Sequence, residues 1–230
     1  MKQTLYLFQY KNGYRYNSDS LVLYDFISTF KPKGKILDVG SGSGILGLLL
    51  KRDFPNISLT QIDIQSSNIE LTCKSAKKNN LDSKVLHADV RECRFSKKFD
   101  FIVTNPPFYH KGSQKSKNED LKVSRYADML PFNELCIAVS QNLKPRGSFI
   151  FCYDAEQIDC LLNILIKNRF KVNYMRFVHT KENKKASIVL IHAKKSSKSL
   201  CKILPPIYMN SNEVEYIYKN TKTESLLCLS

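Results

Sequence analysis

The sequence predicts an α/β fold with one mostly parallel sheet of seven strands, helices on both faces and the last strand antiparallel. From about residue 35 onward, short apolar segments alternate with longer segments of helical pattern, which is the order of a parallel sheet joined by crossover helices. Only the polar turn at residues 180–185 separates the last two strand-like segments. Because that turn is too short for a crossover helix, we expect these two strands to pair antiparallel.

The expected elements follow one another without internal repeats. Strands are expected at residues 35–39, 57–62, 84–87, 99–104, 147–153, 171–178 and 187–193. Helices are expected at residues 45–52, 67–79, 131–143 and 155–168. A shorter helix should begin at a cap, Asn17 or Ser18, carry Asp19 in its first turn and end near Ile27.

Length and hydropathy indicate a single domain. The 230 residues, 43% of them hydrophobic, suffice for one substantial core and are too few for two comfortable domains. We expect a main domain over residues 35–230, preceded by an N-terminal segment, residues 1–34, that holds the short helix. No apolar stretch approaches the roughly 20 residues that cross a bilayer, and the first ten residues do not form a signal peptide. A cytoplasmic protein is expected.

Cysteine and histidine usage argues against a metal centre. The seven cysteines are scattered and never spaced as C-x-x-C, and the four histidines are dispersed. This pattern fits neither a disulfide framework nor a zinc site. We therefore expect no metal.

The net charge of +15 suits a partner rich in phosphate. Two stretches concentrate this charge. Residues 110–126 hold five Lys or Arg against two acids, and residues 181–202 hold seven lysines against one acid. We expect an RNA partner to contact residues 111–125 and 181–202, with a general lysine bias and solvated loops as the alternative.

A glycine-rich turn lies where the first expected strand meets the first crossover helix, in Asp38-Val39-Gly40-Ser41-Gly42-Ser43-Gly44. Glycines there let the backbone approach a ligand closely, and the helix N-terminus adds partial positive charge. Asp63, at the end of the next strand, is placed to accept hydrogen bonds from the ribose hydroxyls of a nucleoside. Residues 42–47 also fit G-x-G-x-x-G, so this loop alone leaves a dinucleotide possible.

Two further features favour S-adenosylmethionine over a dinucleotide. Asp89 follows the third expected strand, where its carboxylate can accept from an adenine amino group. A proline turn, Asn105-Pro106-Pro107-Phe108, follows the fourth. Its prolines fix φ and lack an N–H, so the chain must leave the sheet as a rigid turn. The Asn105 side-chain oxygen and the Pro106 carbonyl then offer acceptors to a planar amino group, and Phe108 offers a ring for stacking.

With these motifs in this order, the chain resembles the class I S-adenosylmethionine-dependent methyltransferases with an Asn-Pro-Pro-aromatic motif. Within them it is most similar to the bacterial tRNA(Val) adenine-37 N6-methyltransferase family. The resemblance covers nearly the whole chain and implies a Rossmann-like class I methyltransferase fold. It extends to residues 19–23, to Arg125 and to residues 203–206.

The resemblance assigns residues to roles. It implies that the cofactor contacts Asp38, Gly40, Gly42, Gly44, Asp63, Ile64, Asp89, Val90 and Asn105. It implies that catalysis rests on Asn105, Pro106, Pro107 and Phe108, with Asn105 and Pro106 as acceptors for the target amino group and Phe108 as the stacking ring. The N-terminal helix is expected to pack near the cofactor. Position 108 departs from the family, which often has Tyr there, so a contact made by a phenol hydroxyl is in doubt.

Several rivals stay open. The same chemistry serves guanine N2 in ribosomal RNA, adenine in DNA and a glutamine amide in a protein. Phe at position 108 is also common in the guanine enzymes. A non-catalytic RNA-binding module and an NAD-dependent oxidoreductase are the alternatives from other classes.

Overall fold

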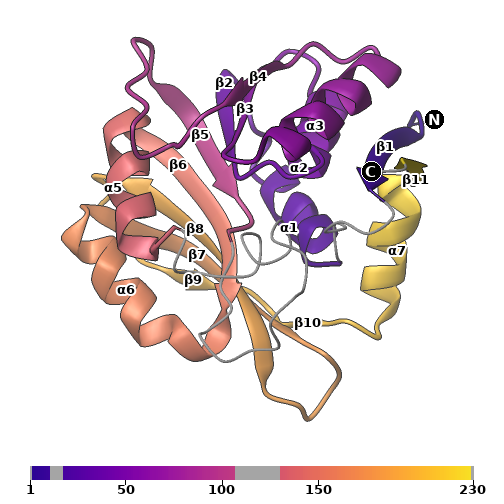
Figure 1. The fold of residues 1–230 in the computed structure, drawn as a ribbon. Helices are drawn as coiled ribbons and strands as arrows, with labels where there is room; N and C mark the ends of the chain where they lie inside the picture. The colour runs from indigo at the N-terminus through magenta and orange to yellow at the C-terminus, as the bar shows by residue number, and fades with distance from the viewer. Residues whose placement is uncertain (1, 11–17, 107–129, 229–230) are drawn as a thin grey trace, which may run out of the picture.

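The fold is organised around one large twisted sheet. The computed structural model describes residues 2–10, 18–106 and 130–228 (Figure 1). The sheet has nine strands in the order β10-β7-β8-β6-β5-β2-β3-β4, with β9 beside β7. Within it only β8 runs antiparallel, against both β6 and β7. The strands are β2 (Lys35–Val39), β3 (Ser58–Asp63), β4 (Lys84–His87), β5 (Phe99–Thr104), β6 (Leu143–Asp154), β7 (Phe170–His179), β8 (Ala186–Lys195), β9 (Lys202–Ile203) and β10 (Ile207–Tyr208).

The predicted α/β class, the seven predicted strands and the antiparallel orientation of the last of them are confirmed. The count of seven was too low for the whole sheet, because β9 and β10 add short edges on the outer side of β7. Each is two residues long. A segment of that length carries no readable alternation of apolar and polar residues, so its sequence does not mark it as a strand.

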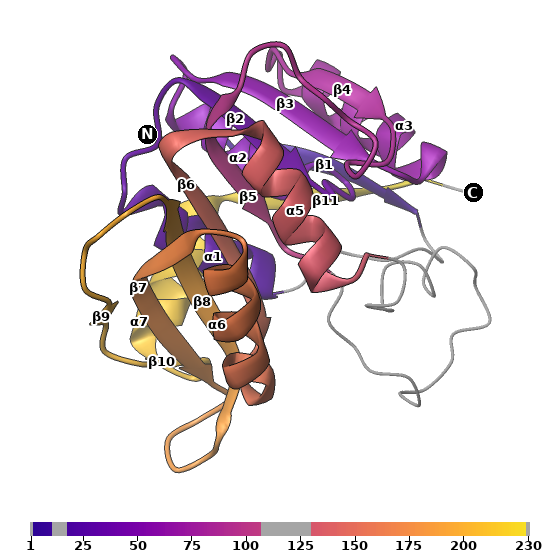
Figure 2. The ribbon, with the colours of Figure 1, turned by 90° about the vertical axis from the view of Figure 1, so that its left-hand side faces the viewer.

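Helices cover both faces of the sheet (Figure 2). One face packs against α1 (Ser18–Ser28), α2 (Ile45–Asp53) and α7 (Asn212–Thr221). The other face packs against α5 (Phe132–Asn142) and α6 (Ile158–Lys167). The helix α3 (Ser66–Lys78) flanks β3 and β4. The helix predicted at 155–168 is divided, since residues Ala155–Gln157 form a 3-10 turn before α6.

The buried side chains form two clusters, one on each face of the sheet. Along β6, Ile150 and Cys152 belong to the cluster under α1 and α2, whereas Phe149 and Phe151 belong to the cluster under α5. This alternation follows from the period of two in a strand. It aims Cys152 at the same side of the sheet as the N-terminal helix.

A second, two-stranded sheet joins the two ends of the chain. Strand β1 (Leu5–Tyr10) pairs in parallel with β11 (Thr223–Cys228). The Tyr6 N–H donates to Asn79 Oδ1 at 2.9 Å and the Phe8 N–H to Ser75 Oγ at 3.0 Å, so β1 also contacts α3. The expectation that the first strand begins at residue 35 was therefore wrong. Parallel pairing between the termini leaves no hairpin signal in the sequence.

Arg52 on α2 ties this small sheet to the main domain. Its guanidinium donates to the carbonyl oxygens of Thr221 at 2.6 Å and Gln3 at 3.1 Å, and also bonds to Asp53. The Arg52 side chain is only 7% exposed. One buried cation thus satisfies a backbone carbonyl next to each terminal strand, which links both ends of the chain to α2.

We expect Arg52→Ala to lower the free energy of unfolding by about 2 to 3 kcal/mol, because hydrogen bonds from a charged donor are among the stronger ones. Urea denaturation measures the change. Arg94→Ala is the control, since its guanidinium bonds only the nearby carbonyls of Arg91 and Cys93. Equal losses in the two variants would contradict the role given to Arg52.

Candidate active site

The glycine loop between β2 and α2 is built from left-handed residues. Gly40, Gly42 and Gly44 have φ of 66°, 57° and 87°. Residues with a Cβ seldom adopt these angles. The N–H groups of Gly40 and Ser41 both donate to the Ile62 carbonyl, at 2.9 and 3.1 Å, which anchors the loop to β3. Apart from the adjacent residues, no atom of the described residues lies within 4 Å of a Cβ built on Gly40 or Gly42, so these residues leave open space on that side.

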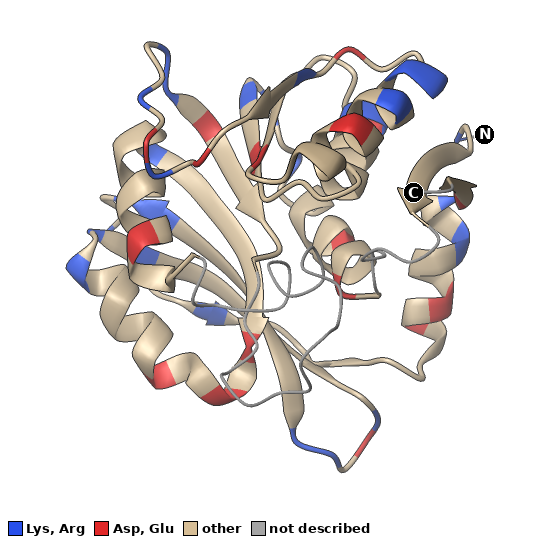
Figure 3. Ribbon diagram, viewed as in Figure 1, with Lys and Arg blue, Asp and Glu red and all other residues tan. Residues whose placement is uncertain are grey.

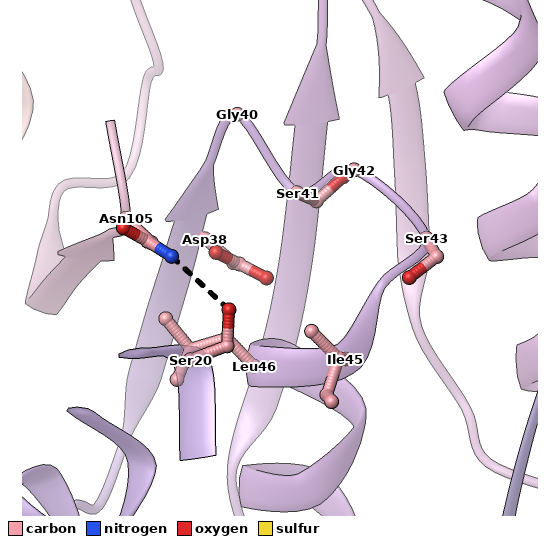
Figure 4. Close-up of a pocket in the computed structure, with 9 residues that line it drawn as sticks. All are labelled: Ser20, Asp38, Gly40, Ser41, Gly42, Ser43, Ile45, Leu46 and Asn105. Atoms are coloured by element: carbon pink, nitrogen blue, oxygen red, sulfur yellow. Dashed lines mark hydrogen bonds between the residues drawn. The ribbon is translucent and has the colours of Figure 1, made fainter. Parts of the chain in front are cut away.

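A pocket opens at this loop, at the carboxyl ends of the parallel strands (Figure 4). It brings together the glycine loop, the start of α2, the helix α1 and the end of β5. Its lining residues are Ser20, Asp38, Gly40, Ser41, Gly42, Ser43, Ile45, Leu46 and Asn105. Of the expected cofactor residues, Asp38, Gly40, Gly42 and Asn105 are among them. Open α/β sheets bind ligands at this edge.

Asp38 is a buried carboxylate, 1% exposed. Its Oδ2 accepts from the Gly47 N–H at 3.0 Å and from Gln61 Nε2 at 3.1 Å. Burial raises the pKa of Asp38 to about 7, because two neutral donors do not offset the loss of water. A Cβ on Gly47 would lie 2.6 Å from Gln61 Nε2, so this close approach requires glycine there.

Asp63 holds the glycine loop from the end of β3. Its Oδ2 accepts from the Gly42 N–H at 2.8 Å, and its Oδ1 accepts from the Gln65 N–H and from Asn68 Nδ2, at 2.9 and 3.2 Å. Burial raises the pKa of Asp63 despite these donors. Asp63 is not among the pocket-lining residues. The Ile64 N–H is a further donor to the same carboxylate.

The remaining expected cofactor contacts lie outside the pocket lining. Asp89 is bound by Arg91, whose Nε and Nη2 atoms donate to it, and these hydrogen bonds lower the pKa of Asp89. Val90 is 4% exposed and belongs to the cluster under α5. Ile64, by contrast, is an apolar side chain left 46% exposed just after β3. Gly44 caps α2 and is likewise not in the lining.

Asn105 enters the pocket from the end of β5. The Thr104 hydroxyl donates to the Val39 carbonyl at 2.8 Å, so the ends of β5 and β2 are held together. Asn105 Nδ2 donates to Ser20 Oγ at 3.1 Å, and Cys152 Sγ donates to Asn105 Oδ1 at 2.9 Å. Pro106 is buried beside it. Pro107 and Phe108, with residues 111–125, lie outside the described residues, so their expected roles stay predictions.

A family model of the methyltransferase small domain matches residues 17–129. The matched segment is 113 of the 230 residues, just under half of the chain. The match includes the glycine loop, Asp63, Asp89 and the proline turn. The expected class I methyltransferase fold, with S-adenosylmethionine as its cofactor, is confirmed.

Relatives of this methyltransferase domain fall into two groups. Two are named tRNA1(Val) (adenine(37)-N6)-methyltransferase. The one from Vibrio campbellii is 27% identical over 143 residues, 61% of this chain and 59% of the relative. The one from Pedobacter heparinus is 28% identical over 176 residues, which are 74% of this chain and 73% of the relative. A ribosomal RNA small subunit methyltransferase C from Actinobacillus pleuropneumoniae is 39% identical over 89 residues, 39% of this chain but only 27% of the relative.

Solved structures share the fold of the methyltransferase domain at low identity. A predicted O-methyltransferase from Agrobacterium tumefaciens has a TM-score of 0.69 at 15% identity, covering 90% of this chain and 99% of the other. A 16S rRNA N2 G1207 methyltransferase from T. thermophilus, in complex with AdoMet and guanosine, has a TM-score of 0.55 at 21% identity, covering 79% and 44%.

Two observations indicate that the lining of the pocket suits S-adenosylmethionine. The open faces of Gly40 and Gly42 let a ligand lie directly on the backbone. The Ser41 hydroxyl lines the pocket and is buried, yet within the described chain it has no hydrogen-bond partner. A buried hydroxyl without a partner is costly, and a polar group of the cofactor would supply one.

Sequence reasoning missed three side chains of this centre: Ser41, Ser20 and Cys152. Ser41 lies inside the glycine motif, so its place there was the available signal. Ser20 and Cys152 come from a helix and a strand 132 positions apart, and only the tertiary fold brings them to Asn105.

Among the described residues, no group of three or more His, Cys, Asp or Glu side chains is arranged to hold a metal ion. No helix in the described ranges is long and apolar enough to cross a membrane.

We expect Asp38 to make stability depend on pH. Its pKa is about 7 when folded and near 3.8 ordinarily, so the folded state binds the extra proton between these values. The free energy of unfolding should therefore fall as pH rises from about 4 to 7, by up to about 4 kcal/mol. Urea denaturation across this window, compared with Asp38→Asn, isolates the effect. A variant that keeps the full wild-type slope would refute it.

Proposed function

We propose that this protein transfers a methyl group from S-adenosylmethionine to the exocyclic amino nitrogen of a base in RNA. The preferred target is N6 of adenine in a tRNA anticodon loop, adenine 37 of tRNA(Val). The observation that carries the proposal is the position of the Asn105 amide, which lines the same pocket as Gly40 and Gly42. The acceptor for an amino group and the backbone surface for the cofactor thus share one cavity.

In this proposal the residues of the chain orient the reactants. S-adenosylmethionine supplies an electrophilic methyl group when bound. Gly40, Gly42 and the Ser41 hydroxyl hold it against the loop, and Asp63 contacts its ribose. Asn105 Oδ1 and the Pro106 carbonyl accept hydrogen bonds from the target amino group. These bonds hold the N–H groups out of the ring plane, which takes the nitrogen lone pair out of conjugation, and they stabilise the positive charge that develops on nitrogen. As the nitrogen–methyl bond forms, the sulfur–methyl bond breaks to leave a neutral thioether, and the methylated nitrogen then loses one proton to solvent.

The expected contact between Asp89 and the adenine of the cofactor must be compatible with the hydrogen bonds that Asp89 accepts from Arg91. Arg91 binds the Asp89 carboxylate through Nε and Nη2 and also bonds Glu134 through Nη1. Arg91 also donates to Asp89 Oδ1 through its backbone N–H and through Nε, so together these bonds take up the roughly four lone-pair sites of the carboxylate. Because Nε is shared between the two carboxylate oxygens, it can release one of them to an adenine amino group while Arg91 stays bound. We propose that Arg91 fixes the carboxylate and that the exposed Ile64 packs against the adenine ring.

An anticodon loop suits this arrangement because the target base must leave its stack to enter a pocket. That step costs least in a single-stranded loop. Relatives named as tRNA adenine methyltransferases match over 59% and 73% of their own length, whereas the small subunit methyltransferase C relative matches over 27% of its length. Similarity over more of the protein favours the tRNA substrate.

A second candidate is guanine N2 in ribosomal RNA. The small subunit methyltransferase C relative has the higher local identity, 39%, and the T. thermophilus structure that shares this fold contains guanosine. A glutamine amide in a protein is less favoured, because the net charge of +15 suits a nucleic acid. An adenine in DNA is less favoured, because the similar proteins reported above are named as tRNA and ribosomal RNA methyltransferases. A non-catalytic RNA-binding module would not need Asn105 in the pocket.

The basic stretch at residues 181–202 does not form one surface. Strand β8 runs antiparallel, so the connection from β7 to β8 lies at the carboxyl edge of the sheet (Figures 1 and 3). This connection holds Lys181 and Lys184. The pocket opens at the same edge. Lys194 lies at the far end of β8, opposite Lys171 on β7. We propose that RNA bound at the pocket contacts the first group and not the second.

Nucleoside mass spectrometry of fractionated tRNA and rRNA, from cells with and without the gene, tests the proposed function. We expect loss of N6-methyladenosine from one tRNA, restored by the wild-type gene and not by Asn105→Ala. The purified variant should lose at least about 100-fold in transfer rate while calorimetry shows nearly unchanged S-adenosylmethionine affinity. Loss of N2-methylguanosine from rRNA would select the second candidate, and a fully active variant would refute the mechanism.

Removing Lys181 and Lys184 together, as glutamines, should weaken RNA binding and flatten its salt dependence. The slope of log K against log salt should fall by about 1 to 2 in magnitude, since each phosphate contact contributes roughly 0.7 to 0.9. The matched control is Lys171→Gln with Lys194→Gln, which removes the same charge at the other edge. Equal changes in the two double variants would show that only net charge matters.

A further inference from the structure

Three segments far apart in the sequence meet around the side-chain amide of Asn105. Its Nδ2 donates to Ser20 Oγ on α1 at 3.1 Å, and Cys152 Sγ on β6 donates to its Oδ1 at 2.9 Å. Ser20 is 5% exposed and Cys152 is fully buried. Figure 4 shows the Ser20 side chain directed at the amide from the α1 side of the pocket.

The register of the sheet puts Cys152 there. Strands β5 and β6 pair in parallel up to Thr104 and Phe151, so the next residues on the two strands are Asn105 and Cys152. The alternation along β6 turns Cys152 toward the face covered by α1. Both partners of the amide are therefore fixed by secondary structure.

The two partners select one orientation of the amide. The terminal torsion of asparagine is broad and roughly twofold, so only the surroundings decide where the oxygen points. A thiol is a weak donor and a weak acceptor, and it pairs better with an amide oxygen than with an N–H₂ group when a hydroxyl acceptor is available to that group. Burial, with a smaller contribution from Asp19, raises the pKa of Cys152, which keeps its S–H in place as a donor.

We infer that Ser20 and Cys152 are positioning residues that lock the Asn105 amide with its oxygen available to the incoming amino group. Oδ1 has two lone pairs, and Cys152 occupies one, so the other is free to accept from the substrate. The inference rests on the proposed role of Asn105. It also makes the N-terminal helix part of the catalytic centre, since Ser20 belongs to α1.

Steady-state kinetics of Ser20→Ala and Cys152→Ala tests the inference, with the unmodified RNA transcript that the wild-type protein methylates. We expect kcat to fall roughly three- to tenfold in each variant, as one hydrogen bond is lost. KM for the transcript and the dissociation constant of S-adenosylmethionine should change less than twofold. Cys152→Ser keeps a donor at this position and should recover part of the loss.

Matched controls separate positioning from stability. Ser28→Ala removes a hydroxyl from the same helix, one that donates to the Tyr24 carbonyl at 2.8 Å and also contacts the Tyr24 side chain. Cys136→Ala removes an equally buried thiol from the opposite cluster. Both controls should keep the wild-type kcat even if they lower Tm. If Ser20→Ala and Cys152→Ala lose no more kcat than these controls, the inference is wrong.

A measurement without RNA keeps the two proposals distinguishable. The Asn105 side-chain amide protons, assigned by their disappearance in Asn105→Ala, should shift in the NMR spectrum of ¹⁵N-labelled Ser20→Ala and Cys152→Ala and stay unchanged in the controls. Unchanged amide resonances would overturn the inference whatever the substrate is. Shifted resonances in a protein that methylates no RNA would instead count against the proposed function alone.

Discussion

The parallel pairing of β2 with β5 is the constraint on which the site depends. It sets Val39 beside Thr104, and the Thr104 hydroxyl closes the pair with a hydrogen bond to the Val39 carbonyl. The glycine loop begins at the next residue of one strand, and Asn105 is the next residue of the other. The glycine motif ends at Gly44 and the proline turn begins at Asn105, 61 positions later. The two motifs meet at one edge of the sheet because neighbouring parallel strands end together.

Two buried carboxylates, Asp38 and Asp63, hold the glycine loop and the start of α2 in place. Asp38 accepts from the Gly47 N–H inside α2, and Asp63 accepts from the Gly42 N–H at the tip of the loop. Burial raises the pKa of each carboxylate. The backbone donor to Asp38 lies in the first turn of α2, whereas the donor to Asp63 is the N–H of left-handed Gly42. The same residues that the sequence marks as ligand contacts are therefore also the supports of the loop. The proposed cofactor contacts at these residues would therefore couple cofactor affinity to loop geometry.

The sequence predicted best where one local pattern sufficed. Strands β2, β4 and β5 have the expected bounds, because apolar runs there end at a glycine, an acid or a proline turn. The glycine loop and Asn105 were identified for the same reason. Strands β1 and β11 were not predicted, since each pairs with a partner more than 200 positions away. Strand β1 is further stabilised by contacts with α3. Helix α7 was not predicted either, although its apolar side chains Val214 and Ile217 are buried in the core.

The parts of the site that the sequence did not reveal share one property. Ser20, Cys152 and the Arg91 pair act on other residues of the chain, so their meaning depends on where those residues stand in space. A motif reports what a ligand requires of the backbone, such as glycine at positive φ or proline without an N–H. It does not report how the fold orients an amide whose two ends are nearly the same size. That orientation is set jointly by α1, β5 and β6, so the amide geometry on which the proposed contact with an amino group depends is a property of the tertiary structure.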